Sequence, residues 1–287
     1  MNFTSRAFHH IKESARIPSF STYEERIHPY IKEIFTRIPG AGYIEVPGNS
    51  LIYKLQSPGT EYTIALAAHL DKINHYGSDF PPQLPVEEGE NYLEGAMDDC
   101  AGLGVLLALA EKSEELRSRP NLLFYFSEME ESKGLKEHPK LLKNNGQGYN
   151  NGMGARRISK ACLENGNIPD EIITVDTTPL FKGDPGIALY SNHWELTDLE
   201  ASEDLINKTK ATVQRVKSIE PKIKLANNTN DYLHYGYEFN KDLDKSVVSV
   251  ALEPAIFPYH QKGERVFKND ISRVMNILVR YLDEVGL

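Results

Sequence analysis

Hydrophobic positions along the chain recur with two spacings, and together they predict alternating helices and strands. Apolar residues three and four positions apart predict helices over 3–15, 22–37, 99–118, 155–164, 198–218 and 269–285. Short apolar runs bounded by Gly, Pro or Asn predict strands over 42–46, 51–55, 62–68, 121–127, 171–175, 186–190, 222–226 and 246–252. The run 62–68 does not alternate with polar residues, which is typical of a strand buried on both faces.

This alternation predicts a layered α/β fold, a three-layer α/β/α sandwich with a mixed, mostly parallel central sheet. The turn residues 47–50 predict an N-terminal hairpin, which makes the sheet mixed. Two polar segments, 72–95 and 132–155, are expected to be long loops, and the sequence does not tell whether they close over a site. No linker divides the chain, so residues 1–287 are expected to form a single domain without a separate lid or dimerisation domain.

Composition narrows the classes of function. The chain has 32 Lys and Arg against 41 Asp and Glu, a net charge of −9, and it lacks the basic blocks of a nucleic-acid-binding protein. No apolar run approaches the roughly 20 residues that a membrane helix needs, and no secretory signal is visible, so no membrane partner is expected. Its two cysteines make no disulfide framework. Together these features predict a cytoplasmic protein in a reducing compartment.

Polar side chains with metal-binding chemistry follow four predicted strands and open one predicted helix. They are His69-x-Asp71, Asp98-Asp99 at the helix start, Glu130-Glu131, Asp176 and His260. Each has an ordinary explanation when taken alone, such as a core histidine, a helix cap, an acidic turn or a surface loop. Taken together, they lie where open α/β sheets bind ligands, at the carboxyl ends of strands. Histidines and carboxylates are the ligands that zinc and similar divalent ions prefer.

The order His-x-Asp, Asp-Asp-x-x-Gly, Glu-Glu, Asp, His resembles the dinuclear zinc exopeptidases of clan MH, and the resemblance covers residues 16 to 265. The gaps 69–98 and 176–260 are too short to hold an inserted domain beyond the strands and helices of the fold. In this the chain is similar to the single-domain bacterial zinc aminopeptidases, whose family also contains glutamate carboxypeptidase and the glutaminyl cyclases. One departure is Glu-Glu-Ser-Lys-Gly after the strand, where the family commonly has Glu-Glu-x-Gly.

The resemblance implies a centre with two divalent metal ions, zinc or alternatively cobalt or manganese. It implies that Asp98 bridges the two ions, with the following peptide bond in the cis form. His69 and Asp176 are then expected to complete one metal site, and Glu131 and His260 the other.

The resemblance also implies the catalytic roles. Glu130 is expected to be the general base that takes a proton from a metal-activated water, and Asp71 to hold the ring of His69. The implied activity is that of an aminopeptidase that cleaves N-terminal residues from peptides or acts on small amides. Residues close to the last strand, Asp231, Tyr232 and His234, are weaker candidates for contacts with the substrate.

Several alternatives stay open at this point. A deacylase or a carboxypeptidase would use the same site, a glutaminyl-cyclase-like transferase would use one zinc ion, and a metal-free binding module would have lost a ligand or the base. No member of the set is missing here, which favours a metallo-hydrolase. The preferred side chain, the native metal and the oligomeric state do not follow from the sequence.

Overall fold

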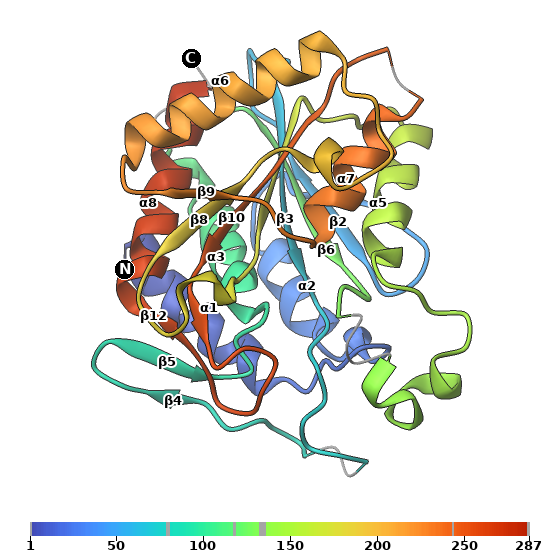
Figure 1. Ribbon diagram of the computed structural model, residues 1–287, viewed down its shortest axis with the longest axis vertical. Helices are drawn as coiled ribbons and strands as arrows, with labels where there is room; N and C mark the ends of the chain where they lie inside the picture. The colour runs from blue at the N-terminus through green and yellow to red at the C-terminus, as the bar shows by residue number, and fades with distance from the viewer. Residues whose placement is uncertain (1, 79–80, 117–118, 132–135, 243, 286–287) are drawn as a thin grey trace.

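The computed structural model describes residues 2–78, 81–116, 119–131, 136–242 and 244–285. A twisted eight-stranded sheet runs through the molecule (Figure 1). Its strands, in spatial order, are β1 (Gly42–Ile44), β2 (Leu51–Leu55), β6 (Asn121–Ser127), β3 (Thr63–His69), β7 (Glu171–Val175), β10 (Val248–Pro254), β8 (Ile187–Tyr190) and β9 (Lys224–Ala226). The four central strands β6, β3, β7 and β10 are parallel, whereas β2 and β8 pair with them in the antiparallel sense. The predicted mixed, mostly parallel sheet is confirmed.

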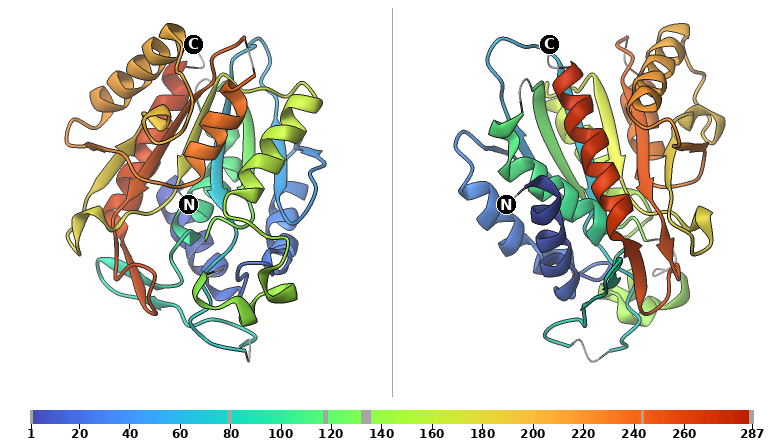
Figure 2. Two further views of the ribbon diagram at one scale, coloured as in Figure 1. Left: turned by 45° about the vertical axis from the view of Figure 1, so that its right-hand side comes forward. Right: turned by 90° about the vertical axis from the view of Figure 1, so that its left-hand side faces the viewer.

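Helices cover both faces of this sheet, as a three-layer sandwich requires (Figure 2). One face carries α1 (Phe3–Arg16), α2 (His28–Thr36), α3 (Cys100–Glu111) and α8 (Lys268–Val285), and the other carries α5 (Met153–Glu164) and α7 (Asp231–Asn240). Helix α6 (Glu203–Ile219) packs against α8 and β10. Alternate residues of β3 point into the two cores, Leu66 into one and Ala67 into the other. This double burial explains why the strand has a continuous apolar sequence.

Helix α3 is the most buried helix of the sandwich. All residues from Cys100 to Ala110 are buried, because α3 lies between the sheet and helices α1, α2 and α8. Gly104 permits this close packing, since a Cβ atom built there would lie 2.3 Å from Cγ1 of Ile11 and 2.6 Å from its backbone nitrogen. An apolar helix of this kind has no solvent-facing stripe, as its sequence indicates.

A second, smaller sheet lies beside the carboxyl end of β3 and was not predicted. Its order is β11 (Ile256–Phe257), β12 (Glu264–Phe267), β5 (Tyr92–Gly95) and β4 (Glu87–Glu88), with all pairs antiparallel. The prediction of a loop throughout 72–95 is therefore wrong for its second half. The reason is that β5 pairs with β12, a partner distant in the sequence, and local patterns carry no signal of such a pairing.

The remaining differences concern the ends of elements. The predicted helix 99–118 ends at Glu111, and residues 117–118 lie outside the described ranges. The predicted helix 22–37 begins only at His28, after a short 3-10 turn. In the predicted loop 132–155, residues 132–135 also lie outside the described part. No helix within the described ranges is long and apolar enough to cross a membrane. The single-domain organisation stays a prediction.

Candidate metal centre

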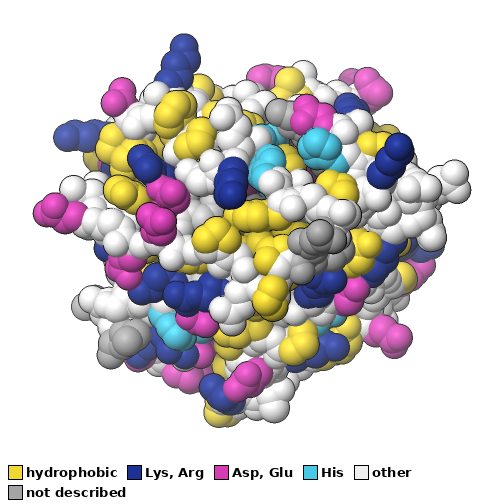
Figure 3. All heavy atoms as spheres, turned by 90° about the horizontal axis from the view of Figure 1, so that it is seen from below, with side chains coloured by type: hydrophobic (Ala, Val, Ile, Leu, Met, Phe, Trp, Pro, Cys, Tyr) yellow, Lys and Arg dark blue, Asp and Glu magenta, His cyan; other side chains and the backbone are white. Residues whose placement is uncertain are grey.

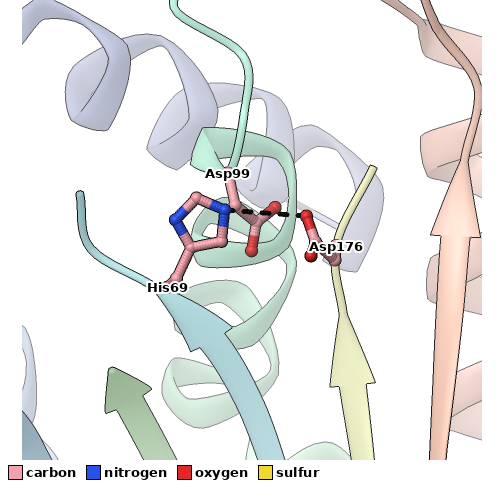
Figure 4. Close-up of side chains that lie close together, drawn as sticks. All are labelled: His69, Asp99 and Asp176. Atoms are coloured by element: carbon pink, nitrogen blue, oxygen red, sulfur yellow. Dashed lines mark ion pairs between the residues drawn. The ribbon is translucent and has the colours of Figure 1, made fainter. Parts of the chain in front are cut away.

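The predicted site residues come together at the carboxyl ends of the central strands. His69 is the last residue of β3, and Asp176 directly follows the neighbouring parallel strand β7. Asp98 and Asp99 immediately precede α3, whose first turn faces these strand ends. Figure 4 shows the side chains of His69, Asp99 and Asp176 pointing toward one another from these three elements. The crevice at the strand ends that the fold class predicts is therefore where the candidate ligands lie.

The two histidines approach different oxygens of one aspartate. Nε2 of His69 lies 3.2 Å from Oδ1 of Asp98 and 3.7 Å from Oδ1 of Asp176. Nε2 of His260 lies 3.4 Å from Oδ2 of Asp98 and 3.3 Å from Oε2 of Glu131. Two ligand atoms around a tetrahedral ion with bonds of about 2.0 Å are separated by roughly 3.3 Å. The donor set therefore has the spacing of two adjacent metal sites that share Asp98.

Asp99 also faces the centre, although its position at the start of a helix predicts only a cap. Its Oδ1 accepts a hydrogen bond from the backbone N–H of Gly102 at 2.7 Å and so caps α3. Its Oδ2 is buried without a partner among the described residues. Ligand atoms of His69, Asp99 and Asp176 lie within 4.8 Å of one another. The peptide bond between Asp98 and Asp99 is cis, as the resemblance implies.

Burial sets the proton affinity of the carboxyl groups at the centre. It raises the pKa of most of them, because a buried carboxylate loses its hydration, and this holds for Asp99, Glu130, Glu131 and Asp176. Asp98 differs from these four, because hydrogen bonds from the two histidines outweigh its burial and keep its pKa below the usual value. So many carboxylates are costly to bury together without cations. Divalent ions at the positions that the distances define would remove that cost.

Asp71 contacts two parts of the centre. Its backbone carbonyl accepts a hydrogen bond from Nδ1 of His69 at 2.9 Å, which leaves Nε2 to face the carboxylates. Its own carboxylate lies 3.5 Å from that ring and accepts backbone N–H groups of Glu130 at 2.9 Å and Glu131 at 3.1 Å. The hydroxyl of Ser21 donates to it as well, at 2.8 Å. Asp71 therefore holds the turn after β6 in addition to orienting the ring.

Glu130 lines a cavity beside the centre. In the described part of the chain no hydrogen bond engages its carboxylate, and burial together with nearby acidic groups raises its pKa well above the usual value. The cavity has a volume of about 240 Å³. Its lining combines the two glutamates of the turn with mostly uncharged side chains, namely Asn151, Thr229, Asn230, Leu233, His234, Tyr259 and His260. Figure 3 views the molecule from this end, where histidine side chains reach the surface among hydrophobic and charged ones.

Of the three weaker candidates for substrate contacts, His234 lines this cavity. Burial lowers its pKa to about 4, so the ring is neutral at pH 7, and its Nε2 lies 3.2 Å from Oδ1 of Asn151. Asp231 accepts a hydrogen bond from the hydroxyl of Ser127, and burial raises its pKa to about 7. Tyr232 is fully buried in the core cluster on that side of the sheet.

Two residues around the centre, Asn151 and Glu264, were not predicted from the sequence. The cavity wall includes Asn151 from the loop before α5, and no pattern in that polar loop distinguishes it. Glu264 on β12 accepts backbone hydrogen bonds from Asp98 at 3.1 Å and from His260 at 3.1 Å. Its place four residues after His260 is the one sequence signal that could have drawn attention to it.

Comparisons with known proteins agree with this geometry. The model of peptidase family M28 matches residues 50–156, a segment that contains His69, Asp98 and the Glu130–Glu131 pair. No curated protein sequence matches the chain.

Solved aminopeptidase structures share the fold over nearly the whole chain. A TET aminopeptidase from a marine sediment thaumarchaeon is 9% identical, with a TM-score of 0.68, and the match covers 100% of this chain and 98% of that one. Aminopeptidase PepT from Bacillus cereus is 13% identical, with a TM-score of 0.64 and 99% of both chains covered. The LapA aminopeptidase of Legionella pneumophila is 12% identical, with a TM-score of 0.64, covering 99% of this chain and 71% of that one.

These findings confirm the resemblance to the clan MH exopeptidases that the ordered motifs indicate: residues 50–156 match peptidase family M28, and the chain as a whole has the fold of these aminopeptidases.

Proposed function

We propose that this protein is a metal-dependent aminopeptidase that removes N-terminal residues from peptides at a centre of two metal ions. The observation that carries the proposal is the position of Asp98, whose two oxygens face two different histidines at 3.2 and 3.4 Å. A carboxylate between two histidines is the arrangement that a shared ligand of a two-metal site requires. The match to a peptidase family over the segment that contains Asp98 supports the same conclusion.

The proposed ligands divide into two sets. His69 and Asp176 would hold one ion, Glu131 and His260 would hold the other, and Asp98 would bridge them. Nitrogen and carboxylate donors without a thiolate suit zinc, with cobalt and manganese as alternatives. Two such ions would lower the pKa of a bound water toward neutrality and polarise the scissile carbonyl group.

Glu130 is proposed as the general base. Its carboxylate is free of hydrogen bonds within the described residues and stands where the cavity meets the metal ligands. Its raised pKa means that the carboxylate binds a proton more tightly than an exposed glutamate does, which favours taking a proton from the attacking water. The same proton would then be returned to the leaving amine.

The cavity supports an aminopeptidase over a carboxypeptidase. Its described lining contains Glu130 and Glu131 but no lysine or arginine, and the ring of His234 is neutral at pH 7. A free substrate carboxylate would therefore lack a cationic partner there, whereas a free N-terminal amine would meet carboxylates. The proposed sharing of Asp98 by two ions also argues against the one-zinc cyclase alternative. The cytoplasmic location stays a prediction, as does the absence of a nucleic-acid or membrane partner.

The variant Glu130→Gln tests this proposal. We expect it to retain both metal ions and to lose turnover by roughly a hundred- to ten-thousand-fold, because an amide cannot accept the proton. Metal content by plasma mass spectrometry and hydrolysis of a panel of aminoacyl amides and acyl amino acids would be measured together.

Glu128→Gln is the matched control for that variant. Glu128 is two residues away, but its carboxylate points elsewhere, toward Arg157 and the backbone of Asn49, so turnover is expected to stay close to wild type. Full activity of Glu130→Gln, or a wild-type protein that binds no divalent ion, would contradict the proposal.

A further inference from the structure

Two buried carboxylates contact the main chain of the proposed metal ligands. Glu264, 5% exposed, accepts the backbone N–H groups of Met97 at 2.9 Å and Asp98 at 3.1 Å through Oε2, and that of His260 at 3.1 Å through Oε1. Asp71, fully buried, accepts those of Glu130 and Glu131. Five main-chain donors around the centre therefore converge on two side chains.

The local backbone explains why these donors need acceptors from side chains. Met129 and His260 have φ angles of 60° and 54°, in the left-handed region that few residues other than glycine adopt. A backbone of this kind can turn neighbouring N–H groups toward a common point and form an anion-binding concavity. Buried N–H groups without a partner would be costly, so the carboxylates of Asp71 and Glu264 stabilise these turns.

The two carboxylates belong to different parts of the fold. Glu264 lies on β12 of the small sheet, and it joins the start of α3 to the segment that carries His260. Asp71 follows β3 of the large sheet, and it joins that strand to the turn after β6. Together they hold the main chain of three proposed ligands, Asp98, Glu131 and His260, as well as that of the proposed base.

We propose that Glu264 and Asp71 are positioning residues that fix the main chain of the ligands before metal binds, so that the two-metal site is pre-formed. This inference rests on the proposed function. Neither carboxylate is proposed as a metal ligand. Glu264 acts through main-chain atoms, and Asp71 does so in addition to orienting the ring of His69. A pre-formed site binds metal more tightly, because binding then requires less ordering of the loops that carry the ligands.

Only a carboxylate can make all of these contacts at Glu264. Both of its oxygens accept N–H groups, so an amide would place its own NH₂ group against a backbone donor. We therefore expect Glu264→Gln, and likewise Asp71→Asn, to weaken zinc binding by about 10- to 100-fold, the usual effect of losing a partner that supports a metal ligand.

The test is a titration of the metal-free full-length protein with zinc in competition with a chelator of known affinity. Two matched controls are buried carboxylates away from the centre. Glu171→Gln affects a carboxylate that accepts the hydroxyl of Tyr281, and Asp270→Asn affects one that accepts the backbone N–H of Gly186 at 2.7 Å. Thermal unfolding of each metal-free variant separates stability from metal affinity. The proposal is supported if both controls bind zinc with wild-type affinity while Glu264→Gln and Asp71→Asn bind it more weakly.

Other results would overturn it. If Glu264→Gln and Asp71→Asn lose stability but bind zinc as tightly as wild type, their role is structural only. If the controls lose as much affinity, the effect is not specific to the centre. If the wild-type protein binds two ions and the two variants bind them with the same affinity, only this inference is contradicted. If the wild-type protein binds no ion, the proposed function is overturned as well.

Hydrogen exchange of the wild-type protein gives a second test that needs no variant to fold. In the metal-free state the backbone amides of Met97, Asp98, Glu130, Glu131 and His260 should exchange slowly, because their bonds to Asp71 and Glu264 are already formed. Rapid exchange that slows only after zinc is added would show that the metal orders these segments, and it would contradict the inference.

Discussion

His193 is a buried histidine whose two ring nitrogens have no hydrogen-bond partner among the described residues. It packs against Gly236 of α7, where a Cβ atom would lie 2.4 Å from the ring. Burial lowers its pKa to about 4, because a charged imidazole would lose its hydration there. The unfolded chain takes up a proton at this residue near pH 6.5, whereas the folded protein does so only near pH 4. The folded state therefore loses stability as the pH falls through this window.

We expect this residue to make the free energy of unfolding fall by about 3 kcal/mol between pH 6.5 and pH 4, since one pKa unit corresponds to about 1.4 kcal/mol. His193→Phe should lack that part of the pH dependence. Urea unfolding of both proteins without metal, at pH 7, 5.5 and 4, would measure the difference. Parallel pH profiles for the two proteins would show that the ring is not buried in its neutral form.

At the scale of elements, the contact between α1 and α3 positions one side of the metal centre. Helix α3 begins directly after the Asp98–Asp99 pair, so its placement sets where these carboxylates lie. Gly104 lies one turn into the helix against the backbone of Ile11 and Ala7. At the outer end of the same contact, Glu111 of α3 accepts hydrogen bonds from Arg6 and His10 of α1.

Gly104→Ala tests this close approach. In an ordinary helix interior, replacing glycine by alanine stabilises by about 1 kcal/mol. Here we expect the opposite sign, a loss of about 1–3 kcal/mol, because the new methyl group would overlap with backbone atoms of α1. The free energy of unfolding in urea gives the sign directly, and a more stable variant would mean that the helices are farther apart than described.

Across the whole molecule, folding brings acidic side chains from distant parts of the sequence into one buried cluster. The net charge of the chain is −9, and part of its negative charge gathers at the centre, where Asp98, Asp99, Glu131 and Asp176 are buried and Glu130 lies beside them. The folded metal-free protein must therefore protonate some of these groups or tolerate their repulsion. Metal ions that bind only the folded state should stabilise it.

We expect removal of metal by a chelator to lower the thermal midpoint and zinc to restore it. Zinc at a hundredfold excess over its dissociation constant should add about 2.7 kcal/mol per site. Glu130→Gln should keep this response because Glu130 is not a proposed ligand, whereas Asp98→Asn should lose most of it. Scanning calorimetry with and without zinc would measure both, and an unchanged midpoint in the wild-type protein would contradict the proposed centre.

Elements whose signal lies within a short stretch of sequence were predicted well. Strands such as 51–55, 121–127 and 171–175 were predicted at their observed bounds, because continuous apolar runs between turn residues leave few alternatives. The C-terminal helix was predicted to within one residue, since its apolar residues repeat at helical spacing. The strands of the small sheet were missed, because they are short and pair with segments far away in the sequence.

The sequence by itself determined the central sheet and its covering helices, because hydrophobic periodicity and the positions of strand ends are local properties. The resemblance of its ordered motifs to the clan MH exopeptidases implied which residues are the proposed ligands. Only the tertiary structure decided how those ligands meet. It placed one oxygen of Asp98 before each histidine, turned Asp99 toward the centre, and brought Glu264 from β12 to the main chain of Asp98 and His260. Most of these contacts join residues that are tens to hundreds of positions apart, and they depend on packing that no local pattern records.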